Sequence, residues 1–220
     1  MEVKNGNDIC VITGFTNNIS ILGNFTALAN RSYCLQNNYD FRIFKDKDFD
    51  KSRPASWNKI KFIKKVLPDY KFVFWIDSDA IFTNMRVRLE DFIVDGKDFY
   101  MCQDIPKTKF NGGVMLFRNS EWVFWLLDEI WKIYPHNYGG WEQQAISALY
   151  NEGKLDDRFY FYPHRCFNGF LFVKKLSDYK GGIPEDFLWY EGDFVAHCIT
   201  LTTEQRFDLL RETFNLRVEK

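Results

Sequence analysis

The sequence predicts a single domain of the α/β class, built on an open, mostly parallel sheet flanked by helices. Short apolar runs typical of buried strands alternate along the chain with segments in which apolar residues recur at helical spacing. The first five elements follow the order strand, helix, strand, helix, strand, which is typical of parallel strands joined by right-handed crossovers. With 220 residues, the chain is long enough to bury a substantial core.

The N-terminal part of the chain contains three expected strands. DICVITG is a short apolar run closed by glycine, DFRIFKD alternates between polar and apolar residues, and KFVFWI is an apolar run of the parallel-sheet type. Trp57, Ile60, Ile63 and Val66 follow helical spacing ahead of Pro68. We therefore expect a strand at 8–14, a helix at 20–36, a strand at 40–46, a helix near 57–66 and a strand at 71–76.

The C-terminal part continues the alternation, and no internal repeat, linker or low-complexity tract interrupts it. We expect strands near 98–102 and 113–117, helices at about 121–134 and 141–151, strands near 159–162 and 192–198, and a closing helix near 203–214. One domain therefore accounts for the whole sequence.

The amino-acid composition argues against several classes of protein. Lys and Arg number 29 against 30 Asp and Glu, so the basic excess of a nucleic-acid-binding protein is missing. The sequence has no run of about 18 apolar residues and no apolar segment behind its N-terminus, so we expect no membrane span, no signal peptide and a cytoplasmic location. The five cysteines lie far apart without a CxxC pair, and we expect reduced thiols.

Two carboxylates interrupt the aromatic stretch FVFWIDSDAIF, because Asp77 and Asp79 directly follow the expected strand at 71–76. Ligands of open α/β sheets bind outside the carboxyl ends of the strands. Residues i and i+2 of an extended chain share a face, so both carboxylates should face one ligand, and they repel each other unless a cation lies beside them. A metal site is therefore favoured over the alternative, a turn in which both side chains cap backbone N–H groups.

His197 is the third candidate metal ligand. It ends the segment EGDFVAHC, on the same expected strand face as Asp193 and Val195, where an imidazole needs a partner. Taken alone, His197 is more simply explained as a core histidine bonded to a backbone carbonyl. Two aspartates and one histidine form a hard oxygen site with one nitrogen, which suits Mn²⁺ and tolerates Mg²⁺ or Co²⁺.

The segment 56–85, SWNKIKFIKKVLPDYKFVFWIDSDAIFTNM, resembles the core of the retaining glycosyltransferases of family 34. That family includes fungal galactosyl- and mannosyltransferases and plant xyloglucan xylosyltransferases. Further similar blocks follow in the family's order: VITG (11–14), NRSYCLQNNYDFRIF (30–44), NGGVMLFRNSEW (111–122), WEQQAI (141–146) and GDFVAHC (192–198). The resemblance implies the GT-A fold, a nucleotide-sugar donor, a divalent metal and transfer with retained anomeric configuration.

The resemblance also implies roles for individual residues. Asp77, Asp79 and His197 would hold the metal. At the donor, Thr13 and Gly14 would lie beside the nucleotide, Lys59 near the diphosphate, Ser78 between the two aspartates, and Asn111, Gly112 and Gly113 in a loop against the sugar. Glu142 and Gln143 would lie close to the anomeric carbon. The donor would be a UDP-sugar in preference to a GDP-sugar, and the acceptor a glycan.

Two of the catalytic candidates also have plainer explanations. Glu142 begins the expected helix at 141–151, where a carboxylate commonly stabilises the helix dipole. Asp104 follows the expected strand at 98–102, where it would bind sugar hydroxyls or be a solvated loop residue. Along the chain, we expect residues 1–85 to bind the nucleotide and residues 86–220 to form the acceptor side.

Two other classes of function stay open. The family's histidine is followed by Gly-Cys, whereas here the run is HCITLT, so a catalytically inactive nucleotide-sugar-binding module is one alternative. Val114 and Trp141 also replace a serine and an acidic residue of the family pattern. The other alternative, an Asp-x-Asp phosphohydrolase, would carry its carboxylate pair after the first strand, whereas Asp77 and Asp79 follow the third.

Overall fold

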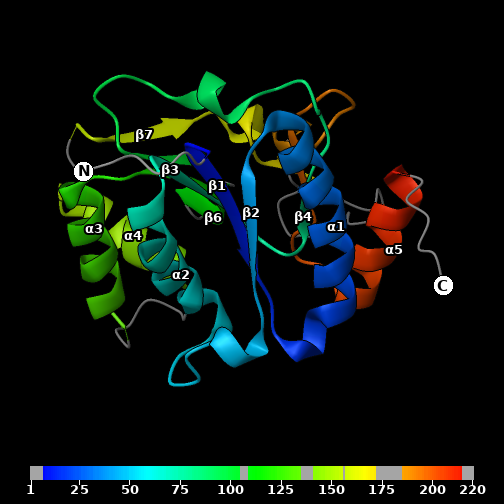
Figure 1. Cartoon of the computed structure of the whole chain (residues 1–220), viewed down its shortest axis with the longest axis horizontal. Coiled ribbons are helices and arrows are strands. Elements are labelled where there is room, and N and C mark those ends of the chain that lie inside the picture. Colours follow the sequence, from blue (N-terminus) through cyan, green and yellow to red (C-terminus); the bar gives the residue numbers. More distant parts are fainter. Residues whose placement is uncertain (1–6, 105–108, 135–140, 156, 172–184, 215–220) are drawn as a thin grey trace.

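A computed structural model describes residues 7–104, 109–134, 141–155, 157–171 and 185–214. A six-stranded sheet in the order β2-β1-β3-β6-β5-β7 forms the centre of the molecule (Figure 1). Its strands are β1 (Ile9–Gly14), β2 (Asp40–Phe44), β3 (Phe72–Ile76), β5 (Phe99–Gln103), β6 (Phe110–Arg118) and β7 (Phe159–Tyr162). Only β6 runs antiparallel to its neighbours in the described sheet, which confirms the expected open, mostly parallel α/β arrangement.

The described residues form five α-helices around this sheet, all close to their expected positions. They are α1 (Ser20–Asn37), α2 (Asn58–Val66), α3 (Glu121–Lys132), α4 (Glu142–Asn151) and α5 (Thr203–Phe214). Helices α2, α3 and α4 lie on one face, and α1 lies on the other with α5 beside it (Figure 1). Each face of the sheet has its own apolar core, because strands buried on both faces carry apolar side chains in both directions.

A second, smaller sheet lies beside α1 and was not predicted. It contains β4 (Ala80–Phe82), β9 (Val195–His197) and β8 (Gly169–Phe170) in the order β4-β9-β8. The expected strand at 192–198 is thus shorter than predicted, and it pairs with the chain immediately after the Asp-Ser-Asp stretch. The junction of the two sheets therefore lies at that stretch.

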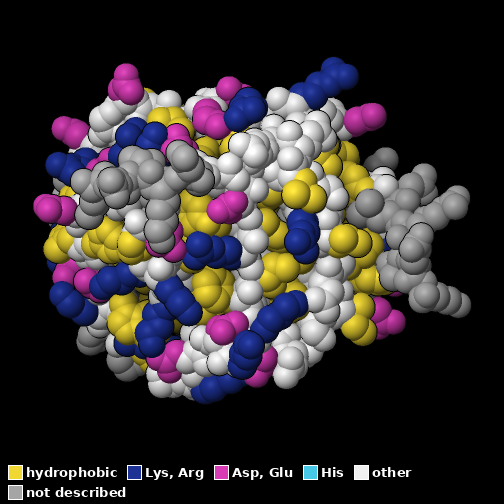
Figure 2. Space-filling view, viewed as in Figure 1, with side chains coloured by type: hydrophobic (Ala, Val, Ile, Leu, Met, Phe, Trp, Pro, Cys, Tyr) yellow, Lys and Arg dark blue, Asp and Glu magenta, His cyan; other side chains and the backbone are white. Residues whose placement is uncertain are grey.

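Helix α1 holds the small sheet in place through polar side chains in its buried face. Asn30 is 1% exposed; its side-chain amide donates to the Ala80 carbonyl and its side-chain oxygen accepts from the Phe82 N–H, both at 3.0 Å. The opposite face of α1 is solvent-exposed and carries Ile21, Leu28 and Leu35, and Figure 2 shows hydrophobic side chains on the surface over this helix. The helix ends at Asn37, and the following residue, Asn38, adopts the left-handed conformation.

Two further predictions from the sequence can be compared with the structure. All five cysteines are free thiols, and four of them are buried. Among the described residues, no helix combines the length and the apolar character needed to cross a membrane.

Candidate active site

The Asp-Ser-Asp stretch forms the turn that leads from the large sheet into the small one. Strand β3 ends at Ile76, and the Ala80 N–H donates to the Asp77 carbonyl at 3.1 Å. The expectation that Asp77 and Asp79 project from one face of an extended chain is therefore wrong, because the chain turns between them. Helix α1 supports this turn, since the Thr26 hydroxyl donates to the Ser78 carbonyl at 2.9 Å.

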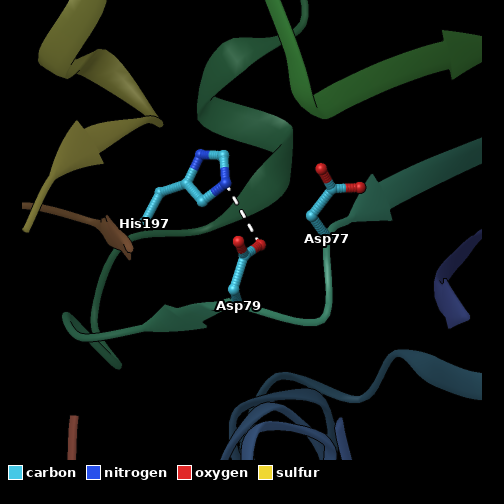
Figure 3. A group of neighbouring side chains, drawn as sticks. All are labelled: Asp77, Asp79 and His197. Atoms are coloured by element: carbon cyan, nitrogen blue, oxygen red, sulfur yellow. Dashed lines mark ion pairs between the residues drawn. The ribbon is translucent and has the colours of Figure 1, made fainter. Parts of the chain in front are cut away.

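The turn nevertheless brings both carboxylates to one place, together with His197 from β9. One ligand atom from each of Asp77, Asp79 and His197 lies within 4.8 Å of the other two, and Figure 3 shows the three side chains converging from different elements. Two carboxylate oxygens and an imidazole nitrogen are the hard donor set expected for Mn²⁺ or Mg²⁺. The three residues thus fit a divalent cation.

Asp79 is buried and has a cationic or donor group at each oxygen. Its Oδ1 lies 3.2 Å from His197 Nε2, and its Oδ2 lies 2.9 Å from a guanidinium nitrogen of Arg206. Burial opposes ionisation of this carboxyl, but His197 and Arg206 outweigh it and hold the pKa of Asp79 below its usual value. Asp79 is therefore a carboxylate, the form in which it could hold a metal.

The orientation of His197 is set by Asn168, a fully buried residue that precedes β8. His197 Nδ1 lies 2.9 Å from the Asn168 side-chain oxygen. An amide oxygen only accepts hydrogen bonds, so Nδ1 carries a hydrogen and the contact with Asn168 leaves Nε2 to face Asp79. Nε2 is therefore the nitrogen that would bind a metal, with Asn168 as the outer hydrogen-bond partner of the ring.

Lys59 links the first aspartate to Glu142. Its ammonium lies 3.0 Å from Asp77 Oδ1 and 2.7 Å from Glu142 Oε1, and it donates to the Gly112 carbonyl at 2.8 Å. Burial would lower the pKa of Lys59, but Asp77 and Glu142 raise it well above its ordinary value. All three of its N–H donors thus meet protein oxygens, so the predicted contact with a diphosphate would require one of these bonds to be given up.

Glu142 and Gln143 begin helix α4 and face the strand that carries the two glycines. Glu142 is 2% exposed, and its Oε2 has no hydrogen-bond partner in the described part of the chain. Gln143 accepts a hydrogen bond from the Gly112 N–H at 3.1 Å. A helix-start carboxylate that only stabilises the dipole is usually solvated, so the burial of Glu142 and its contact with Lys59 favour a specific role.

Asn111, Gly112 and Gly113 belong to strand β6 and not to the expected loop. The register between β5 and β6 shifts here, since Met101 pairs with Met115 but Cys102 pairs with Asn111. Glycine is needed at this irregularity: a Cβ on Gly112 would lie 2.9 Å from Glu142 Oε1, and one on Gly113 would lie 2.2 Å from His197 Cε1. The two glycines let β6 pass between the candidate catalytic carboxylate and the candidate metal ligand.

The remaining predicted site residues follow strands of the large sheet. Thr13 and Gly14 end β1 beside the end of β3, and the buried Thr13 hydroxyl has no hydrogen-bond partner among the described residues. Asp104 lies just beyond β5, with its backbone N–H bonded to the Lys109 carbonyl, and it is buried and not a solvated loop residue. Neither Thr13 nor Asp104 belongs to the group of three metal-ligand candidates.

Sequence reasoning missed two residues of the site, Asn168 and Arg206. Nothing in the segment FNGF marks Asn168 as a histidine partner. Arg206 had a weak signal, because it follows a T-x-x-Q pattern that predicts a helix start at Thr202. Asp193, expected on the face of His197, instead forms a two-pronged ion pair with Arg165, at 2.8 and 3.0 Å.

Sequence comparisons relate the chain to known glycosyltransferases. The family model for the galactosyl transferase GMA12/MNN10 family matches residues 16–103. Galactomannan galactosyltransferase 1 of Cyamopsis tetragonoloba is 29% identical over 45% of this chain and 25% of that protein. An uncharacterized alpha-1,2-galactosyltransferase of Schizosaccharomyces pombe is 28% identical over 76% of this chain and 53% of its own length. The chain spans a quarter to about half of the length of these curated relatives.

Solved structures with the same fold cover almost the whole chain. A glycosyltransferase involved in glycosylation of the major capsid of PBCV-1 superposes with a TM-score of 0.74 at 16% identity, over 93% of this chain and 98% of the other. The galactosyltransferase LgtC, crystallised with donor and acceptor sugar analogs, gives a TM-score of 0.61 at 11% identity, over 96% and 97% of the two chains. The family match and these relatives support glycosyltransferase family 34, the galactosyl transferase GMA12/MNN10 family, and the solved structures show that the chain has the GT-A fold.

Proposed function

We propose that this chain transfers a sugar from a nucleotide-diphosphate sugar, with a UDP-sugar as the first candidate, to a hydroxyl group of a glycan. The transfer would depend on Mn²⁺ and would retain the anomeric configuration. The observation that carries the proposal is the convergence of Asp77, Asp79 and His197 at the end of β3 in a chain of this family. Open α/β sheets bind ligands at such strand ends.

The proposed role of each residue follows from the contacts of its side chain. A divalent cation held by Asp77, Asp79 and His197 would act as a Lewis acid toward the departing diphosphate. Lys59 would keep Asp77 and Glu142 in fixed positions through its two ion pairs. The bond from the Gly112 N–H to Gln143 would fix the start of α4 against β6.

Retention of configuration allows either a covalent intermediate on a carboxylate or a front-side route, and the proposed reaction takes the front-side route. The bond between the anomeric carbon and the diphosphate oxygen breaks, and both electrons leave with the diphosphate. The acceptor oxygen forms the new bond on the same face, and its proton passes to the departing phosphate oxygen. The sugar carries positive charge at the transition state, and the Glu142 carboxylate is suited to stabilise that charge electrostatically.

The proposed arrangement along the chain follows the same contacts. Residues up to about 85 would supply the nucleotide side through Thr13, Gly14 and the Asp-Ser-Asp turn, and residues 86–220 would supply the acceptor side. His197 is an exception, because β9 returns to pair with β4 beside that turn. The acceptor side would include Asp104, which we propose binds sugar hydroxyls.

A donor hydrolysis assay tests this proposal directly. Purified protein is incubated with panels of UDP- and GDP-sugars with Mn²⁺, with Mg²⁺ or with excess EDTA, and the product's anomeric configuration is read by NMR. We expect hydrolysis or transfer only with a divalent ion, and loss of turnover in Asp79→Asn. Asp69 is an exposed aspartate paired with Arg42, so Asp69→Asn is the matched control and should stay active. Full turnover in EDTA or an inverted product would contradict the proposal.

A further inference from the structure

We propose that Arg206 of helix α5 binds the diphosphate of the donor, an inference that rests on the proposed function. Arg206 contacts Asp79, with one guanidinium nitrogen 2.9 Å from Asp79 Oδ2. This is the oxygen that His197 does not approach, since His197 Nε2 lies nearest Oδ1. A ligand bound at Asp79 therefore has the guanidinium beside it.

Lys59, the other cation at this site, is poorly placed for the same task. Its side chain is 4% exposed and its three N–H donors meet oxygens of Asp77, Glu142 and Gly112. The Arg206 side chain is 25% exposed, and its Nε has no hydrogen-bond partner among the described residues. A guanidinium carries five N–H donors in a planar fork that matches phosphate oxygens, so the contact with Asp79 leaves donors for a second anion.

The start of α5 holds Arg206 in a fixed position. Thr202 and Gln205 form reciprocal hydrogen bonds at the helix start, at 3.0 and 3.2 Å. Next along the helix, Phe207 contacts Phe25 of α1 with ring centroids 5.0 Å apart. The chain before the helix is also anchored at the site, because the Cys198 N–H donates to the Asp79 carbonyl at 2.9 Å. A ligand at Asp79 would thus meet a pre-positioned guanidinium and not one on a free loop.

The charges at the site favour the same role. The side chains that meet here include three carboxylates (Asp77, Asp79 and Glu142) and two cations (Lys59 and Arg206). A divalent cation would leave this set with a small positive excess, which favours an anionic ligand. Without Arg206 that positive excess would disappear. The excess matters because the diphosphate gains negative charge as its bond to the sugar breaks. Arg206 would therefore contribute both to donor affinity and to departure of the diphosphate.

Binding measurements that separate the diphosphate from the nucleoside test the inference. Isothermal titration calorimetry is carried out with Mn²⁺ alone, and then in Mn²⁺ with inorganic pyrophosphate, UDP, GDP, uridine and guanosine. For Arg206→Ala we expect pyrophosphate and the preferred nucleoside diphosphate to bind about 10- to 100-fold more weakly, as for a lost bond between charged groups. Binding of Mn²⁺ alone and of the nucleoside should not weaken.

Three further variants keep the result interpretable. Arg206→Gln preserves length and hydrogen bonding if Arg206→Ala does not fold, and it should show the same selective loss. Arg206→Lys restores charge without the fork and should give intermediate affinity. Arg211→Ala, on the same helix but paired with Asp208 and Glu212, should bind every probe like wild type.

The outcomes distinguish the inference from the proposed function. Wild type that binds Mn²⁺ with pyrophosphate but neither nucleotide contradicts the UDP- or GDP-sugar proposal, while the Arg206 variants still test the diphosphate contact. Wild-type and Arg206→Ala proteins with equal diphosphate affinity overturn the inference alone. Weakening of Mn²⁺ binding as large as that of pyrophosphate also overturns it, because Arg206 would then only shape the metal site. A wild type that binds no probe overturns both.

Discussion

His197 presents Nε2 to Asp79 because Asn168 occupies the other ring nitrogen. Without that partner, the imidazole could exchange its hydrogen between the two nitrogens or rotate away. Outer partners of this kind raise the affinity of a metal-ligating histidine by fixing its ring and tautomer. At the scale of single residues, the candidate metal site thus depends on a neutral side chain outside the group formed by Asp77, Asp79 and His197.

Asn168→Ala should weaken Mn²⁺ binding about 10- to 100-fold, because His197 loses its fixed tautomer. Metal titration measures the affinity, and ¹⁵N NMR of labelled histidine reports which ring nitrogen carries the hydrogen. Asn168→Asp, which keeps an acceptor at the same place, should retain the wild-type tautomer. An unchanged affinity together with an unchanged tautomer in Asn168→Ala would show that Asn168 only fills space.

Glu142→Gln preserves shape and removes the charge that we propose acts on the sugar. We expect kcat to fall by roughly 10²-fold or more, in the range of a lost electrostatic contact, with donor affinity little changed. Glu121 also begins a helix, α3, and is exposed, so Glu121→Gln is the matched control. Equal, small effects of both substitutions on kcat would return Glu142 to the ordinary role of a helix-start carboxylate.

Among the structural elements, β6 shows most clearly where sequence reasoning stops. The apolar runs that predicted β1 and β3 and the spacing that predicted α2 depend on local periodicity, and these elements lie where expected. The register shift in β6 and the small β4-β9-β8 sheet depend on contacts between distant segments. For the same reason the sequence predicted Asp77, Asp79 and His197 from their chemistry, but not Asn168 or Arg206, whose roles depend only on tertiary contacts.

Alanine substitutions at the two glycines of β6 should have separable effects. In Gly113→Ala the new Cβ would lie 2.2 Å from His197, so the ring must move and Mn²⁺ affinity should fall by at least about tenfold. In Gly112→Ala the close contact, at 2.9 Å, is with Glu142, so kcat should fall while Mn²⁺ affinity is retained. Metal titration and steady-state kinetics on both variants measure the difference. Identical losses in both would indicate general disruption of β6.

On the scale of the whole molecule, His164 connects the two sheets. It lies between β7 and β8, and its Nδ1 donates to the carbonyl of Gln103 at the end of β5. Burial lowers the pKa of His164 to about 4, against an ordinary value of 6.5, and its Nε2 is buried without a partner in the described part of the chain. The folded protein therefore holds this histidine neutral.

The free energy of unfolding should depend on pH through His164. Between pH 6.5 and about 4 the unfolded chain binds the proton that the folded chain excludes, so this contribution is complete above pH 6.5 and is lost as the pH falls through that window. Its upper limit is about 3 kcal/mol. Urea unfolding across this range should show a shallower pH dependence in His164→Gln than in wild type. Parallel curves for the two proteins would assign the pH dependence to other groups.

The pairing of β4 with β9 involves only three residues on each strand, and His197 is one of them. So short a ladder opens readily on its own, and its backbone amides should exchange with solvent sooner than those of the six-stranded sheet. A cation held by Asp77, Asp79 and His197 would link β9 to the turn after β3, two segments that lie more than a hundred residues apart in the sequence. Binding of the cation would then slow amide exchange in β9, so exchange in this strand would measure occupancy of the site without knowledge of the sugar transferred.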